Sequence, residues 1–112
     1  MDCIFCDIAN KRTRAKVVYE TDDYMAFENI NPSAPVHLLL IPKEHIDKKN
    51  AISGSNPTFW SDFMLEANRV IKKLELDKTG YRIVNNGAGY HAIDHEHIHI
   101  LGGAGWKPTD KL

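Results

Sequence analysis

The feature that most constrains the fold is a run near the C-terminus in which histidines occupy every second position. Side chains of a β-strand alternate between its two faces, so residues two apart point the same way. The run ends at Gly102 and Gly103, and it is too short and too β-branched to favour a helix. It predicts a strand with three imidazoles on one face and a carboxylate and two isoleucines on the other: His95, His97 and His99 against Glu96, Ile98 and Ile100.

The rest of the chain predicts four more strands and one long helix. Short β-prone runs lie at 16–20, 24–29, 36–42 and 81–86, and the almost wholly apolar run at 36–42 predicts a central strand. After a polar segment at 48–56 that we expect to be a mobile loop, Asn56 is a candidate N-cap and Pro57 a first helical residue. With a short helix or turn at 4–9, the pattern predicts an α+β fold whose sheet is mostly antiparallel.

Composition limits what such a chain can be. With 112 residues we expect a single domain spanning 1–112. The formal charge of -1 and the lack of a basic block argue against an extended nucleic-acid surface. No signal-like or long apolar segment is present, so we expect no membrane association and a cytoplasmic location. Under reducing conditions the pair Cys3 and Cys6 indicates metal or redox chemistry more than a structural disulfide.

The row of histidines has three interpretations: a solvent-facing polar strand, a metal site, or a catalytic group. The preceding segment, residues 85–92 with the sequence NNGAGYHA, carries glycines whose backbone amides could approach a phosphate. Phosphoryl transfer needs such donors, a nucleophile and an acid for the leaving group. This combination favours catalysis, with the middle histidine, His97, as the nucleophile.

The segment HEHIHIL at 95–101 resembles the His-φ-His-φ-His-φ-φ signature, where φ is apolar, of the histidine triad superfamily of nucleotide hydrolases and transferases. CIFCDI, GYRIVNNG and HILGGAGW extend the likeness to its Hint branch over nearly the whole chain, except about 47–60. The resemblance implies a five-stranded antiparallel sheet with one long and one short helix. It also implies a homodimer in which two such sheets form one of ten strands.

The resemblance further implies hydrolysis of a purine nucleoside phosphoramidate, or a related nucleotidyl compound, at the α-phosphate, without a catalytic cofactor. His97 would attack phosphorus to give a nucleotidyl-histidine, and His99 would contact the phosphate and help to protonate the leaving group. His95 and His37 would extend the hydrogen-bond network. The nucleotide-binding positions that it implies are Phe5, Ile8, Phe27, Ile30 and Leu39 for the purine, Asn29 for the ribose, and Asn85, Gly89 and His91 for the phosphate. Trp106 matches a tail aromatic that reaches towards the partner subunit.

Several residues depart from the family pattern. Asn29 stands where aspartate is usual, and His91 and Ala92 stand where glutamine and serine are usual. Glu96 replaces an apolar residue, and burying its carboxylate would require a partner such as a lysine. These departures leave an alternative open, namely a purine nucleotide-binding or interaction module with weak or no catalysis.

A structural zinc site is also implied by the resemblance, because some bacterial-type members hold zinc with a similar Cys-x-x-Cys and two histidines. The matching residues here are Cys3, Cys6, His45 and His95. Two thiolates and two imidazoles would make a closed tetrahedral site that supports folding and leaves no open position. The competing interpretations are two thiols without metal and a catalytic zinc at the triad, and only the latter predicts that a chelator abolishes turnover.

Overall fold

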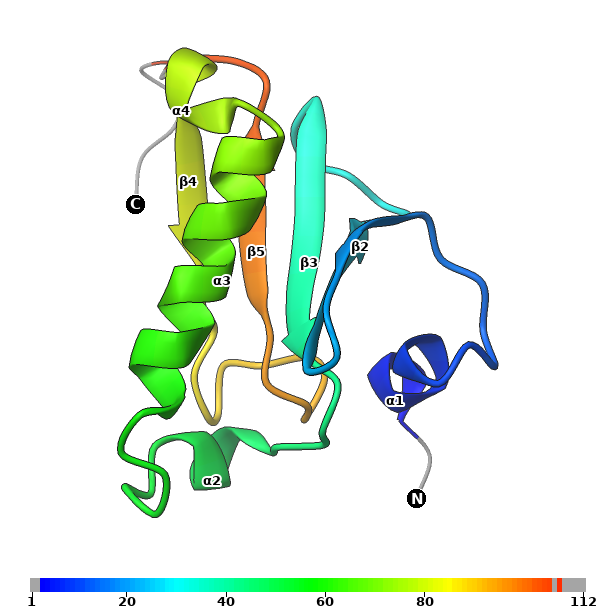
Figure 1. The fold of residues 1–112 in the computed structure, drawn as a ribbon, viewed down its shortest axis with the longest axis vertical. Coiled ribbons are helices and arrows are strands. Elements are labelled where there is room, and N and C mark those ends of the chain that lie inside the picture. The colour runs from blue at the N-terminus through cyan, green and yellow to red at the C-terminus, as the bar shows by residue number, and fades with distance from the viewer. Residues whose placement is uncertain (1–2, 106, 108–112) are drawn as a thin grey trace.

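The computed structural model describes residues 3–105 and 107, and it confirms the α+β fold with a five-stranded antiparallel sheet in the order β1-β2-β3-β5-β4 (Figure 1). The strands are β1 (Val17–Glu20), β2 (Tyr24–Glu28), β3 (Val36–Pro42), β4 (Tyr81–Val84) and β5 (Ile98–Gly102). The helices are α1 (Ile4–Ala9), α2 (Lys48–Ala51), α3 (Phe59–Lys73) and α4 (Leu76–Thr79). The long helix and the short N-terminal helix match the prediction, and α2 and α4 add two further single turns. Trp106 lies outside the described residues.

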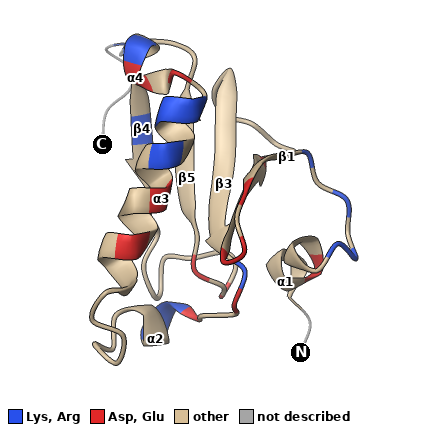
Figure 2. Cartoon of the chain, viewed as in Figure 1, with Lys and Arg blue, Asp and Glu red and all other residues tan. Residues whose placement is uncertain are grey.

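Helix α3 forms because apolar residues recur at helical spacing on one side of it and pack in the larger hydrophobic cluster: Phe59, Phe63, Ala67, Val70 and Ile71. Its charges suit the helix dipole, with Asp62 in the first turn and Lys72 and Lys73 in the last (Figure 2). The predicted N-cap was wrong by two residues, because the helix begins at Phe59 with Thr58 as its cap. The Asn56 side chain instead accepts a hydrogen bond from the Thr58 hydroxyl, within a turn that precedes the helix.

The two faces of the sheet carry different layers. Alternate residues of the central strands, among them Leu38, Leu40, Ile98 and Ile100, pack under α3 in the larger hydrophobic cluster. The residues between them face the opposite side, where a smaller cluster forms around α1 and consists of Cys3, Phe5, Ile8, Ala9, Met25, Phe27, Leu39 and Ile41. His97 and His99 alternate with Ile98 and Ile100 along the chain, so these two histidines lie on the face of the sheet that α1 covers.

The segment at 48–56, predicted as a loop, contains α2. Asp47 caps this turn by accepting a hydrogen bond from the Asn50 N–H, and Ala51 contributes to the cluster under α3. Lys48 is 1% exposed, so this short helix carries a fully buried cation into the fold. Within the described ranges, no helix has the length and apolar character needed to cross a bilayer.

Candidate active site and metal centre

Only one of the three histidines of the run lies in a strand. β5 begins at Ile98, so the prediction that the strand also covers His95 and His97 was wrong. The reason is that the backbone of this segment bonds outside the sheet: the Glu96 N–H donates to the Ile46 carbonyl at 2.7 Å. The shared face is retained nonetheless, since the rings of His97 and His99 meet edge to face with centroids 5.3 Å apart.

The His97 ring is held in one tautomer. Its Nδ1 lies 2.8 Å from the His95 carbonyl oxygen. A carbonyl can only accept, so Nδ1 carries the proton and Nε2 keeps its lone pair. Within the described part of the chain Nε2 makes no hydrogen bond. Burial lowers the pKa of His97, which favours the neutral ring with a free nitrogen lone pair.

His37 and His99 form a second ordered pair. The Ser33 N–H donates to His37 Nδ1 at 3.0 Å, so the proton of His37 must be on Nε2. His37 Nε2 lies 2.9 Å from His99 Nδ1 and therefore donates to it, which leaves the proton of His99 on its own Nε2. Burial, followed by the charges of His97 and His37, lowers the pKa of His99 to about 4. Burial likewise lowers the pKa of His37.

Most of the predicted purine-binding residues lie together beside these histidines. Strand register places Phe27 opposite Leu39 and Leu39 opposite His99, so the three form a row on one face of the sheet. Phe5 meets the rings of Phe27 at 5.8 Å and His97 at 5.1 Å, and Ile8 packs in the same cluster.

The structure does not bring every predicted nucleotide-binding residue into this cluster. Ile30 is 91% exposed on the loop after β2 and lies outside the cluster. Asn29 uses its side-chain oxygen to accept from the Asn31 N–H at 2.8 Å, and its amide nitrogen lies 3.4 Å from His37 Nε2.

The predicted phosphate-binding residues already have partners inside the protein. Gly89, at a φ of 93°, donates its N–H to His91 Nδ1 at 3.1 Å. Asn85 uses its side-chain amide to donate to a Glu96 carboxylate oxygen at 2.7 Å and to the His97 carbonyl at 3.0 Å. Asn85 therefore holds the main chain of His97 through the hydrogen bond to its carbonyl.

Glu96 has the basic partner that its position required. The Lys48 ammonium bonds to the same carboxylate oxygen that Asn85 contacts, and both charged side chains are 1% exposed. Sequence reasoning anticipated a lysine without identifying it. Lys48 comes from the segment with no counterpart in the family pattern, and the only sequence signal was the unmatched charge of Glu96.

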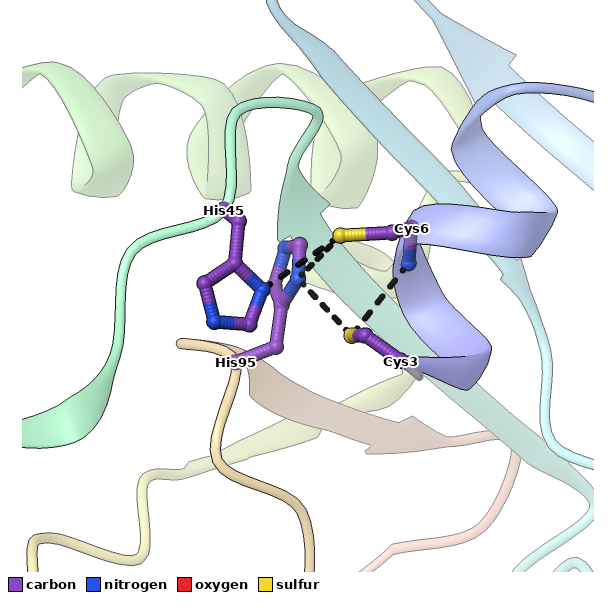
Figure 3. Close-up of side chains that lie close together, drawn as sticks. All are labelled: Cys3, Cys6, His45 and His95. Carbon is purple, nitrogen blue, oxygen red and sulfur yellow. Dashed lines mark hydrogen bonds between the residues drawn. The ribbon is translucent and has the colours of Figure 1, made fainter. Parts of the chain in front are cut away.

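The predicted metal ligands form a compact cluster (Figure 3). Cys3 Sγ lies 3.4 Å from His95 Nδ1, and Cys6 Sγ lies 3.3 Å from His45 Nδ1 and 3.5 Å from His95 Nδ1. The ligand atoms around one tetrahedral zinc are separated by about 3.3 to 3.8 Å, given usual zinc bond lengths. These three distances and the donor set fit this metal, and all four ligand atoms lie within 4.8 Å of one another.

The surroundings of the cluster also fit a metal. His95 Nε2 donates to the Pro42 carbonyl at 2.8 Å, which fixes the ring so that the lone pair of Nδ1 faces the thiols. Burial, followed by the hydrogen bond with Cys3, raises the pKa of the Cys6 thiol, and a bound cation would favour its thiolate form. The four residues can hold a metal ion, and both nitrogens of the His95 ring are then engaged.

Two surface hollows lie away from the predicted site residues. One of about 540 Å³ lies between the β1–β2 turn and α3, and one of about 500 Å³ lies at the end of β4 and β5. None of the predicted catalytic, nucleotide-binding or metal-binding residues lines either of them. The predicted site residues lie instead around the histidine cluster on the α1 face.

Comparison with known proteins agrees with this geometry. Protein HitA of Neisseria gonorrhoeae is 38% identical over 102 residues, which cover 90% of this chain and 95% of that protein. A histidine triad protein from Clostridium difficile superposes with a TM-score of 0.86 at 38% identity, covering 96% of this chain and 95% of that one.

Two further solved structures carry functional names. A HIT family hydrolase from Legionella pneumophila has a TM-score of 0.86 at 34% identity, covering 98% of this chain and 100% of that one. A histidine triad nucleotide-binding protein from Candida albicans has a TM-score of 0.76 at 29% identity, covering 95% and 83%. The HIT domain model matches residues 10–105, and the chain belongs to the HIT domain family, the histidine triad proteins.

Proposed function

We propose that this protein hydrolyses purine nucleoside phosphoramidates or related nucleotidyl compounds at the α-phosphate, through a nucleotidyl-histidine at His97. The observation that carries the proposal is the hydrogen bond from His97 Nδ1 to the His95 carbonyl, because it leaves the Nε2 lone pair available for attack. Similarity to a HIT family hydrolase and to a histidine triad nucleotide-binding protein supports the reaction class and the ligand.

The proposed reaction has two displacements at phosphorus. In the first, His97 Nε2 forms a bond to phosphorus as the bond to the leaving amine breaks, and the amine takes a proton from the imidazolium form of His99, which the negative charge of the bound phosphate favours. In the second, water attacks phosphorus as the bond from phosphorus to His97 Nε2 breaks, the nucleoside monophosphate leaves, and the proton that water loses returns to His99. The ordered pair of His37 and His99 supports this role, because it leaves a proton on His99 Nε2.

The α1 face supplies the proposed nucleotide contacts. Phe5, whose ring contacts those of Phe27 and His97, packs with Phe27, Ile8 and Leu39 in the smaller hydrophobic cluster, and each of these four side chains is less than 9% exposed. We propose that the purine binds against this cluster, with Ile30 folding over it from the exposed loop and Asn29 contacting the ribose.

A specific observation favours the alternative of a nucleotide-binding module with slow turnover. The Gly89 N–H, proposed as a phosphate donor, is already bonded to His91, and His91 Nε2 lies 3.7 Å from the Asp94 carboxylate. A phosphate must displace His91 from Gly89 to gain this donor, and Ala92 offers no side-chain hydrogen bond in compensation.

The test is the release of AMP from adenosine 5'-phosphoramidate by the purified protein and by His97→Ala, with AMP binding and metal content measured for both. Turnover by the wild type and its loss in a folded His97→Ala protein that still binds AMP is the expected result. AMP binding by a wild-type protein that gives no turnover would instead establish the binding module.

We further propose that Cys3, Cys6, His45 and His95 hold a structural zinc.

We also propose that residues 1–112 form one domain and that two copies of it pair into a homodimer. β4 is an edge strand of the sheet, and Tyr81 at its start is 50% exposed, so pairing of two β4 edges would give ten continuous strands. Light scattering tests this arrangement: a mass of twice 12.7 kDa is expected, and a mass of 12.7 kDa would contradict it.

A further inference from the structure

The main chain of His97 is held by side chains instead of by the sheet. β5 starts one residue later, so neither the N–H nor the carbonyl of His97 belongs to the strand ladder. The N–H donates to a Glu96 carboxylate oxygen at 2.9 Å, and the carbonyl accepts from Asn85 at 3.0 Å. Both peptide groups of His97 thus depend on one small polar cluster.

Glu96 is the centre of that cluster. Its Oε1 atom accepts from the Lys48 ammonium, from the Asn85 amide and from the His97 N–H. Lys48 also lies 3.5 Å from the His97 carbonyl. Among the described residues, no fully buried side-chain nitrogen or oxygen lacks a hydrogen-bond partner, so the cluster is complete without a ligand.

Helix α2 is attached to the histidine segment at two points. The Lys48 side chain reaches Glu96, and the Lys48 N–H donates to the Asp94 carboxylate at 2.9 Å. These bonds join residues 46 and 48 positions apart in the sequence. The helix therefore braces the segment on both sides of the metal ligand His95.

Stability alone does not account for this arrangement. Removing two charges from water is costly, and replacing a buried ion pair by apolar residues of similar size is often neutral or stabilising. The free-energy cost of burying Lys48 and Glu96 is offset by a gain in rate if the pair fixes the backbone of His97. A displacement of about 1 Å at a reacting group can lower a rate a hundredfold.

We propose that Glu96 and Lys48 are positioning residues for His97: Glu96 accepts the His97 N–H, and Lys48 holds Glu96 in place to do so. The nucleophile is thereby oriented with its Nδ1 on the His95 carbonyl. This inference rests on the proposed function, and it adds residues that act through His97 without contacting the substrate.

Two matched double variants test it. Lys48→Met with Glu96→Gln removes both charges and keeps an oxygen that can accept the His97 N–H. Lys48→Met with Glu96→Met removes the charges and the acceptor, and Met is close to Gln in length. Lys49→Met is the control, since Lys49 lies next to Lys48 on the same helix and is exposed. For each protein we would measure kcat, KM, AMP affinity and the thermal midpoint.

The double variant with Glu96→Gln, here the Gln variant, is expected to keep kcat within a few-fold of the wild type; the double variant with Glu96→Met is the Met variant. The Met variant is expected to lose about tenfold to a hundredfold in kcat, with KM and AMP affinity changed by less than about twofold. Equal kcat values in the two double variants would overturn the proposal and leave the pair a purely structural role. If Glu96→Met prevents folding, Glu96→Leu in the same background serves as the second apolar variant.

A readout independent of turnover separates this inference from the proposed function. Long-range proton–nitrogen NMR spectra distinguish the two neutral tautomers of the His97 ring. The Nδ1–H form is expected in the wild type and the Gln variant, and a mixture in the Met variant. If the wild type proves inactive, this pattern still supports the positioning role, whereas one tautomer in all three proteins would contradict it.

Discussion

His95 and His97 are two residues apart and chemically identical, yet the structure gives them opposite situations. The ring of His95 has partners at both nitrogens, with Pro42 at Nε2 and the two thiols around Nδ1. Among the residues that the structure describes, the ring of His97 has a hydrogen-bond partner only at Nδ1. What a histidine can do here is decided by which of its nitrogens remains free.

One peptide group connects the two situations. The carbonyl of His95 accepts the Nδ1–H of His97, so the residue that belongs to the metal cluster also fixes the tautomer of the proposed nucleophile. Phe5 adds a second connection, since it lies between Cys3 and Cys6 in sequence and its ring contacts both His95 and His97. A metal at the cluster would therefore stabilise the geometry around His97 without taking part in the reaction.

Replacing His97, the proposed nucleophile, is expected to have the largest effect on the rate. His97→Gly should lower kcat for adenosine 5'-phosphoramidate by about a thousandfold or more, because the residue that forms the covalent bond is lost. Added imidazole should restore part of the rate by attacking in its place. Rescue is measured as AMP release against imidazole concentration, and a variant with near wild-type turnover would refute the assignment.

Removing a metal ligand should act on stability instead. Cys3→Ser is expected to abolish bound zinc and to lower the free energy of unfolding by about 4 kcal/mol when metal is present at a thousand times its dissociation constant. Metal analysis and denaturant unfolding measure the two quantities. Wild-type metal content and stability in this variant would eliminate the proposed zinc site.

Changing the partner of His99 should have a smaller effect on the rate. His37→Ala removes the donor that fixes the His99 tautomer and is expected to lower kcat about a hundredfold, within the usual contribution of a proton-transfer group. Steady-state kinetics measure it, with AMP affinity as the check on folding. An unchanged kcat would mean that His99 is oriented without His37.

The last expected effect is on the pH dependence of the free energy of unfolding, and it leaves stability at neutral pH unchanged. Because the pKa of His99 is lowered to about 4 from 6.5, the unfolded chain binds more protons between these values. The free energy of unfolding should therefore fall as the pH falls from 6.5 to 4, and the contribution of His99 should be constant above that window. NMR titration of its ring, assigned with His99→Gln, checks this, and a midpoint at or above 6.5 would contradict it.

The sequence was sufficient to predict the sheet and the long helix, because each depends on a local pattern, and the family resemblance predicted the group of four candidate metal ligands. Alternating apolar residues define the strands, and the Cys-x-x-Cys pair with two histidines matches a known ligand set. The structure brings Cys3, Cys6, His45 and His95 together as that match required. Roles at the other site residues stay predictions until they are tested by measurement.

The details that sequence failed to predict depend on partners from distant segments. Nothing local indicated that β5 would begin only at Ile98, because the backbone of Glu96 and His97 bonds to Ile46 and to a side chain. Lys48 was unrecognised for the same reason, since a lysine in a polar segment is usually exposed. Asn85, predicted to support the phosphate site, donates its side-chain amide to Glu96 and to the His97 carbonyl, and its role at the phosphate stays a prediction.

The most direct test of the central claim is to locate the covalent nucleotide. The wild-type protein would be mixed with adenosine 5'-phosphoramidate, quenched in alkali because a phosphorus–nitrogen bond to histidine is labile in acid, and mapped by peptide mass spectrometry. An adenylyl group is expected on His97 alone, with His95 unmodified. An adduct on His95 or His99, or turnover without any adduct in a protein that retains its metal, would contradict it.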